Sequence, residues 1–146
     1  MFRINRSLIE VYMPPGFGHT VLVVDDEPTV RTLVATILAA GGYDVLTSSN
    51  GPDALRMAAE KRIDLLLTDM MMPGMDGVEL ITRARAEAGA SIGRFMVMSG
   101  YVSDLRHAPE LAGVPLVSKP FTSRDLLDRI QGVLGYSDGP GRVREP

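Results

Sequence analysis

The sequence predicts an α/β fold in which helices cover both faces of a parallel sheet. Two observations support this fold class: apolar runs of strand length alternate with segments of helical periodicity, and those runs are almost continuously apolar. Strands that are apolar on both sides need burial on both faces, which is typical of a parallel sheet between two helix layers. The chain has 146 residues, 45% of them hydrophobic, which suits one compact domain with its own core.

Five segments have the length and composition of strands. Four are strongly apolar: VLVV at 21–24, IDLLLT at 63–68, FMVM at 95–98 and VPLV at 114–117. The fifth, YDVLTS at 43–48, is weaker, and no chemically distinctive residue follows it. We therefore expect this fifth segment at an edge of the sheet.

The segments between these strands have apolar residues spaced three and four apart, as helices require. Both ends of the first helix are marked by the sequence, because Pro28 precedes its apolar stripe and Gly41 and Gly42 follow it. The predicted stripes are Val30, Leu33, Val34, Ile37 and Leu38, then Ala54, Leu55, Ala58 and Ala59, then Leu80, Ile81, Ala84 and Ala88, and finally Leu126, Leu127, Ile130, Val133 and Leu134 in a helix starting near Thr122. A further helix near 103–111 should be short, because Pro109 interrupts it.

The alternating pattern predicts one domain over residues 19–135. Residues 1–18 and 136–146 lack sustained periodicity, so we expect an N-terminal extension or linker and a disordered C-terminal tail. The net charge is -3 and no basic stripe occurs, so direct binding of nucleic acid is not expected. The chain has no cysteine, no signal-peptide pattern and no apolar run near the roughly 20 residues that span a membrane, so we expect a cytoplasmic protein.

Polar residues follow four of the five predicted strands. They are Asp25-Asp26-Glu27 after VLVV, Asp69 after IDLLLT, Ser99-Gly100 after FMVM and Ser118-Lys119-Pro120 after VPLV. Each group alone is ordinary turn, cap or surface chemistry. Because open parallel sheets bind ligands outside the carboxyl ends of their strands, four such groups at one edge predict a functional site.

The residue types in this predicted site suit a phosphoryl group. Asp25, Asp26 and Asp69 would repel one another unless a cation lies among them, and carboxylate oxygens favour magnesium over zinc. Lys119 offers a positive charge and Ser99 a hydrogen bond to phosphoryl oxygens. A carboxylate nucleophile, a metal ion and an ammonium group are sufficient chemistry for phosphoryl transfer.

Four segments resemble, in order, the signature blocks of two-component response-regulator receiver domains: VLVVDDEPTVR, LLLTDMMMPGMDGVEL, FMVMSGY and PLVSKPF. The resemblance covers about residues 20–134. It implies a flavodoxin-like fold with strand order 2-1-3-4-5, and a phosphoryl group carried by Asp69 after transfer from a histidine kinase or histidine phosphotransfer protein. Such a domain is a signalling phosphoacceptor that catalyses only its own magnesium-dependent phosphorylation and dephosphorylation.

The resemblance also implies roles for individual residues. Asp25, Asp26, Asp69 and the backbone carbonyl of Met71 would hold magnesium, while Ser99 and Lys119 would sense the phosphoryl oxygens. The peptide between Lys119 and Pro120 is typically cis in this family.

At three positions near the implied site, the residue type is expected to change how the domain keeps or responds to a phosphoryl group. Met71 and Tyr101 match the two family positions that face the phosphoryl group, and both are bulky, so we expect them to hinder the attacking water and slow phosphate loss. Leu116 stands where the family usually has an aromatic residue that rotates inward on phosphorylation. With leucine there, this aromatic part of the usual switch is not expected. Movement of the loop after Ser99, with Tyr101, is a candidate substitute.

The loop MMMPGMDG at 70–77 is unusually apolar for its position. By resemblance, Pro73 and Gly74 shape a turn, Gly77 lets the chain pass close by, and Met72 is a packing residue, since methionine fills irregular gaps.

Other functions stay open. A haloacid-dehalogenase-like phosphatase also uses a strand-end aspartate and magnesium, but it needs Asp-x-Asp where this chain has Asp25-Asp26-Glu27. A phosphorylation-independent interaction module of the same fold would generally lack the acceptor or the lysine, and both are present. Nucleotide binding has little support, because no glycine-rich phosphate loop follows the first strand.

Output is expected through contact with an unknown downstream protein, because the residues after Leu134 are too few for a DNA-binding or catalytic module. The chain is then either a stand-alone receiver or the receiver portion of a hybrid kinase. Two features favour the hybrid kinase: SGY at 99–101, and IEVYMPP at 9–15, which resembles the closing strand of a kinase ATP domain. Formation of a homodimer also stays open.

Overall fold

The computed structural model describes residues 14–88, 91–100 and 108–135, and it confirms the predicted α/β fold class. Five parallel strands form one sheet in the order β2-β1-β3-β4-β5, as the resemblance implies. The strands are β1 (Thr20–Val24), β2 (Asp44–Ser48), β3 (Ile63–Asp69), β4 (Ile92–Ser99) and β5 (Leu116–Ser118). The weak fifth segment is β2, and it lies at an edge of the sheet, as predicted.

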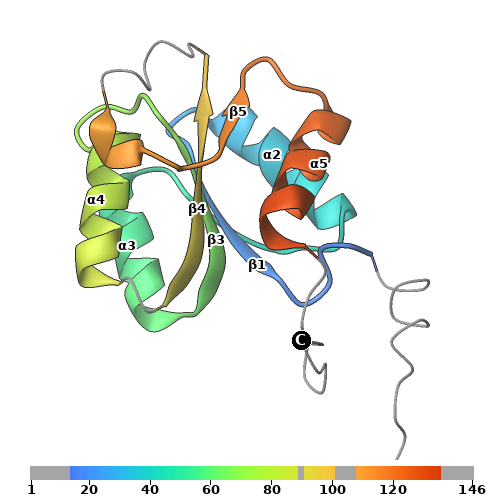
Figure 1. The fold of residues 1–146 in the computed structure, drawn as a ribbon, viewed down its shortest axis with the longest axis horizontal. Helices are drawn as coiled ribbons and strands as arrows, with labels where there is room; N and C mark the ends of the chain where they lie inside the picture. Colours follow the sequence, from blue (N-terminus) through green and yellow to red (C-terminus); the bar gives the residue numbers. More distant parts are fainter. Residues whose placement is uncertain (1–13, 89–90, 101–107, 136–146) are drawn as a thin grey trace, which may run out of the picture.

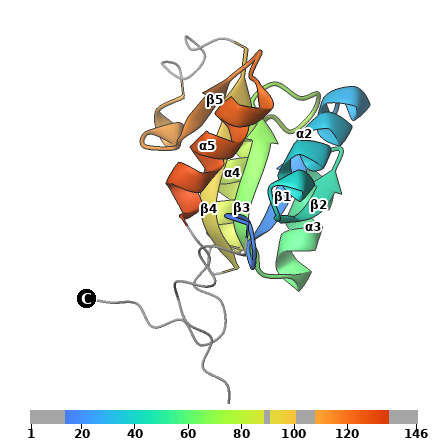
Figure 2. The same ribbon diagram turned by 90° about the vertical axis from the view of Figure 1, so that its right-hand side faces the viewer.

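The described residues also form four α-helices and one short 3-10 helix, each of which follows a strand in the chain. They are α2 (Pro28–Ala40), α3 (Gly51–Glu60), α4 (Gly77–Glu87), η2 (Pro109–Leu111) and α5 (Ser123–Leu134). Helices α3 and α4 cover one face of the sheet and α2 and α5 cover the other (Figure 1). In the view of Figure 2, α2 and α5 lie in front of the strands. No helix within the described ranges is long and apolar enough to cross a membrane.

The predicted helix near 103–111 appears, in its described part, only as the 3-10 turn η2, while residues 101–107 lie outside the described residues. Pro109 begins this turn. The first position of a helical turn suits proline, because the N–H that proline lacks has no partner within the turn there.

Polar side chains fix where the helices begin. The Asp76 carboxylate accepts a hydrogen bond from the Glu79 N–H at 2.9 Å, at the start of α4. Thr122 and Asp125 form a reciprocal capping box at the start of α5. Such caps satisfy N–H groups that have no partner inside the helix.

Apolar side chains fill both layers between the sheet and its helices. The fully buried stretch Val21–Val24 sends alternate side chains into the two layers, as a central strand must. A third cluster lies below η2 and consists of Met70, Ile81, Val97, Ala108 and Leu111, with Leu116 packed against it. This third cluster brings η2 and β5 next to the residue that follows Asp69.

Residues 14–19 lead into β1 beside the start of β2. The Gly16 N–H donates to the Gly41 carbonyl at 3.0 Å, and the Asp44 N–H donates to the His19 carbonyl at 3.0 Å. A Cβ atom at Gly16 would lie 2.5 Å from the Tyr43 ring, so only glycine fits there. The segment 14–18, which the sequence analysis assigns to the N-terminal extension, thus packs on the domain, while residues 1–13 and 136–146 lie outside the described residues.

Candidate functional site

The carboxyl edge of the sheet brings Asp25, Asp26 and Asp69 together. Strands β1 and β3 are neighbours with Val24 opposite Thr68, so the next residues, Asp25 and Asp69, emerge side by side. One oxygen from each of the three carboxylates lies within 4.8 Å of the others. Asp25 is fully buried, Asp69 is mostly buried and Asp26 is exposed. We call these three residues the acidic cluster.

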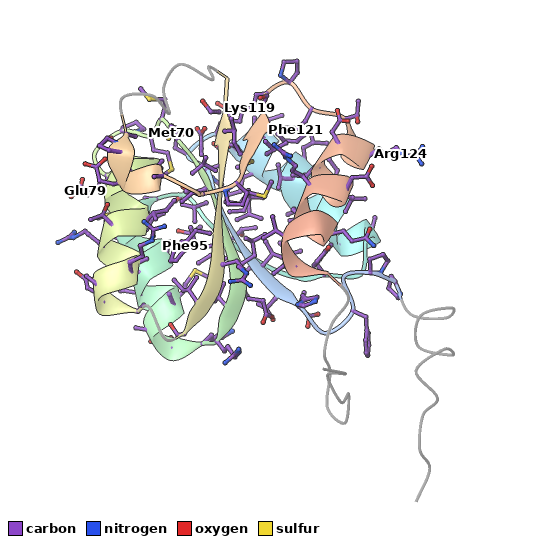
Figure 3. All side chains as sticks on the ribbon, viewed as in Figure 1. Met70, Glu79, Phe95, Lys119, Phe121 and Arg124 are labelled. Carbon is purple, nitrogen blue, oxygen red and sulfur yellow. The ribbon has the colours of Figure 1, made fainter. Side chains whose placement is uncertain are left out.

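Lys119 reaches the acidic cluster from the other side. Its Nζ lies 3.1 Å from Asp69 Oδ1 and 3.4 Å from Asp25 Oδ2. Strand β4 separates β3 from β5, so the long lysine side chain spans the end of β4 to make these contacts. Figure 3 shows Lys119 and Met70 at this same end of the sheet. The peptide between Lys119 and Pro120 is cis, as the resemblance implies.

The position of Lys119 follows from the register of β4 and β5. Ser99 lies opposite Ser118 in the ladder, and the Lys119 N–H donates to the Ser99 carbonyl at 2.7 Å. Ser99 itself is buried, with 2% of its surface exposed. The structure therefore places Ser99 and Lys119 on adjacent strand ends, as the sequence analysis expects, with Lys119 directed to the carboxylates.

The turn after β1 is held by hydrogen bonds at each polar atom of Asp25. Its N–H donates to the Ser48 carbonyl at 3.2 Å, and its Oδ1 accepts from the Glu27 N–H at 2.9 Å. The Asp25 carbonyl accepts from Arg31 Nη1 at 2.8 Å. Arg31 is not among the residues that the sequence predicts for the site. The signal that could have revealed it is a basic residue at the end of the first turn of the helix that follows a strand-end acidic pair.

The environment of Asp69 raises the pKa of its carboxyl group. Burial is the largest influence and raises the pKa, because a low-dielectric surrounding disfavours the charged form. The charge of Lys119 and its hydrogen bond lower the pKa, the charge of Asp25 raises it, and the Met70 N–H lowers it. A cation bound in the acidic cluster would favour the ionised carboxylate.

The loop after β3 folds most of its methionines into the protein. Met72 and Met75 are buried in the layer beneath α3 and α4, as the packing role predicted for Met72 requires. Met71 is instead 67% exposed and directly follows the Asp69-Met70 pair. Gly74 has a φ of 76°, a backbone conformation that favours glycine. The apolar character of this loop thus reflects core packing, except at Met71.

Gly77 lies where the loop returns to the end of β3. A Cβ atom there would be 2.6 Å from the Asp69 carbonyl oxygen and 3.0 Å from Met70 Cα. The Gly77 N–H donates to the Met70 carbonyl at 2.9 Å, which keeps the two segments in contact. This close passage confirms the role that the sequence analysis assigns to Gly77.

Leu116 and Tyr101 are the remaining predicted positions. Leu116 is partly buried against the third apolar cluster, and its carbonyl accepts from Arg129 Nε at 2.9 Å. It contributes no polar group to the acidic cluster. Tyr101 lies outside the described residues.

Comparison with known proteins gives concordant results. Residues 21–131 match the family model described as the response regulator receiver domain. The phosphate regulon transcriptional regulatory protein PhoB of Pseudomonas aeruginosa is 34% identical over 131 residues, which cover 88% of this chain and 57% of that protein. The chain therefore spans little more than half the length of this curated relative.

Solved structures show the same fold. The chemotaxis protein CheY4 of Vibrio cholerae superposes with a TM-score of 0.73 at 30% identity, covering 80% of this chain and 98% of that one. The response regulator protein TrrA of Thermotoga maritima, in complex with Mg²⁺-BeF, gives a TM-score of 0.71 at 29% identity, covering 80% of this chain and 99% of that one.

Proposed function

This chain belongs to the family of response regulator receiver domains, and we propose that it acts in a two-component phosphorelay in which Asp69 is the phosphoacceptor. Receiver domains are signalling domains that interact with histidine kinases or phosphotransfer proteins. The observation that carries the proposal is the contact of Lys119 Nζ with Asp69 at 3.1 Å, beside two further carboxylates. A nucleophilic carboxylate, a fixed ammonium group and a cation site together suit phosphoryl transfer.

The acidic cluster fits magnesium by the chemistry of its donors. Three carboxylates face one lysine, which leaves excess negative charge that a hard divalent cation would balance. We propose Asp25, Asp26, Asp69 and the Met71 backbone carbonyl as the ligands. Bound there, the ion would neutralise charge on phosphoryl oxygens. The complex of TrrA with Mg²⁺-BeF supports this proposal by similarity.

In the proposed transfer, an oxygen of the ionised Asp69 carboxylate forms a bond to the phosphorus of a phosphohistidine. The phosphorus–nitrogen bond breaks, and its electron pair stays on the imidazole nitrogen of the partner. Lys119 then exchanges its contact with the carboxylate for a contact with a phosphoryl oxygen, and the Ser99 hydroxyl donates to another. Because Asp69 reacts as the anion, its raised pKa makes a nearby cation important for reactivity.

We propose that Met71 prolongs the life of the phosphorylated state. Its side chain is exposed next to the acceptor strand end, where it would obstruct a water molecule approaching the acyl phosphate. The companion proposal for Tyr101 rests on the sequence resemblance. A Met71→Asn, Tyr101→Ala variant should lose phosphate faster than the wild type, and an unchanged rate of loss would contradict the proposal.

Intact-mass measurement after incubation with magnesium and a small-molecule phosphodonor tests the function. We expect one phosphoryl addition, absent without magnesium and absent in Asp69→Asn. The matched control is Asp128→Asn, which removes a largely exposed carboxylate on α5 and should be phosphorylated normally. No addition to a folded wild type that binds magnesium would favour a phosphorylation-independent module instead. Continuous release of phosphate from a monoester by the wild type would favour a phosphatase.

A further inference from the structure

We propose that Arg31 is a positioning residue for the acidic cluster, because its bond to the Asp25 carbonyl determines where the Asp26 carboxylate lies. The inference rests on the magnesium binding proposed above. Arg31 touches no predicted ligand atom, so it would act only through the backbone of the turn that carries Asp25 and Asp26.

The contacts of the two aspartates differ sharply. Asp25 is fully buried and is held at its N–H, its carbonyl and both carboxylate oxygens. Asp26 is exposed, and none of the hydrogen bonds or ion pairs described in the structure involves its carboxylate. The direction of the Asp26 side chain therefore depends on the orientation of the peptide that joins it to Asp25.

Arg31 is the side chain that fixes this peptide from the helix side. It reaches back from α2 to donate through Nη1 to the Asp25 carbonyl, six positions earlier in the sequence, at 2.8 Å. Among the described residues, Arg31 forms no ion pair with a carboxylate, so the carbonyl is its structural partner. A charged donor to a part-buried carbonyl makes a stronger hydrogen bond than a neutral donor does.

A purely electrostatic role of Arg31 predicts the opposite change in magnesium affinity. Arg31 carries a positive charge beside three carboxylates, so by Coulomb's law its removal should tighten binding of a divalent cation. If Arg31 positions the turn, its removal should weaken binding despite the favourable change in charge. Residues that orient ligands from outside the coordination shell typically contribute about 10- to 100-fold to metal affinity.

The test is a magnesium titration of the full chain by calorimetry, without phosphodonor, comparing Arg31→Met and Arg31→Lys with the wild type. Arg31→Met should raise the magnesium Kd about tenfold, at the low end of the range for such residues, because Arg31 acts on the backbone and not on a ligand atom. Arg31→Lys keeps a charged donor, so its loss should be smaller.

The control is Arg124→Met, which removes a cation at the start of α5 whose side chain is 89% exposed and points away from the sheet (Figure 3). Its Kd should stay unchanged or fall slightly. Amide hydrogen exchange of Glu27 in the metal-free protein gives a second measurement, since this N–H donates to Asp25 Oδ1. Exchange should be faster in Arg31→Met.

Each outcome separates the two hypotheses. A folded Arg31→Met that binds magnesium as tightly as the wild type, or more tightly, would overturn the positioning role alone. Unchanged Glu27 exchange in that variant would also count against it. A wild type that binds no magnesium would overturn the proposed metal site, and the inference with it.

Discussion

Gly77→Ala tests whether the loop after β3 must pass as close to Asp69 as the structure indicates. An ordinary contact between a Cβ atom and another heavy atom is at least 3.4 Å, and the added Cβ would lie 2.6 Å from the Asp69 carbonyl oxygen, so the atoms must separate by 3.4 − 2.6 = 0.8 Å. The oxygen belongs to backbone at the end of a central strand and cannot rotate away. The strain therefore falls on the β3 end and on the start of α4.

Two effects of the substitution oppose each other. Alanine is favoured over glycine in a helix by about 1 kcal/mol, which should stabilise α4. Overpacking of a close-packed site costs about 1–3 kcal/mol. Because the contact is with backbone, we expect the cost of overpacking to exceed the gain in helix propensity. The free energy of unfolding should then fall by up to about 2 kcal/mol, the difference between these two terms. Phosphorylation of Asp69 should also slow, since its backbone must move.

Gly132→Ala is the matched control, because Gly132 lies in α5 and an added Cβ there meets no atom within 4 Å. Helix propensity alone should stabilise this variant by up to about 1 kcal/mol. Urea unfolding of both variants and the wild type measures the two changes. The reasoning would be refuted if Gly77→Ala proved as stable as Gly132→Ala and was phosphorylated at the wild-type rate.

Three further predictions concern the site and its core. Burial raises the pKa of Asp69 in the folded chain, so the folded state binds that proton more tightly than the unfolded state does. The bound proton of Asp69 therefore stabilises the folded state at pH values below the ordinary carboxyl pKa. This stabilisation is lost as the pH rises through the raised pKa. In unfolding experiments with a chelator, Asp69→Asn should be more stable than the wild type at neutral pH, with a difference that shrinks in acid. Since Lys119 lowers the pKa of Asp69, Lys119→Met should raise it further, and a carboxyl NMR titration that moves the other way would contradict the assignment. Leu126→Ala should lower the free energy of unfolding by about 2–5 kcal/mol, because the side chain is fully buried against the sheet; a change below 1 kcal/mol would show that the layer collapses around the cavity.

Much of the fold could be predicted because burial imposes a simple pattern on a parallel sheet. The four strongly apolar segments correspond to β1, β3, β4 and β5. Asp25 after β1, Asp69 at the end of β3 and Lys119 after β5 meet at one edge. The boundaries were less predictable. The sequence predicts a strand over 114–117, but β5 begins at Leu116, after Pro115, which has no N–H to donate to a neighbouring strand. The Pro115 carbonyl still accepts from the Val97 N–H at 3.0 Å.

Other features depend on contacts between distant residues that periodicity does not encode. The bond from Arg31 to the Asp25 carbonyl requires the exact path of the turn between β1 and α2. The packing of residues 14–18 depends on Gly16 lying against Tyr43, a contact that no local pattern indicates. The sequence therefore predicts which groups would carry the proposed chemistry, whereas the long-range contacts around those groups become visible only in three dimensions.

By the resemblance, Leu116 stands where the family usually has an aromatic switch residue, and this would limit the ways in which the proposed phosphorylation could be read out. An aromatic residue with a polar end has reason to alternate between a buried and a solvent-facing position, whereas leucine has no polar group to return to water. Leu116 is already packed against the third apolar cluster, which also contains Met70, the residue after Asp69. We therefore expect Leu116→Ala to cost about 1–2 kcal/mol of stability, less than a fully buried leucine, and to leave the extent of Asp69 phosphorylation unchanged. If intact-mass measurement instead showed lower phosphorylation of a folded Leu116→Ala variant, the leucine would have to take part in stabilising the phosphorylated state.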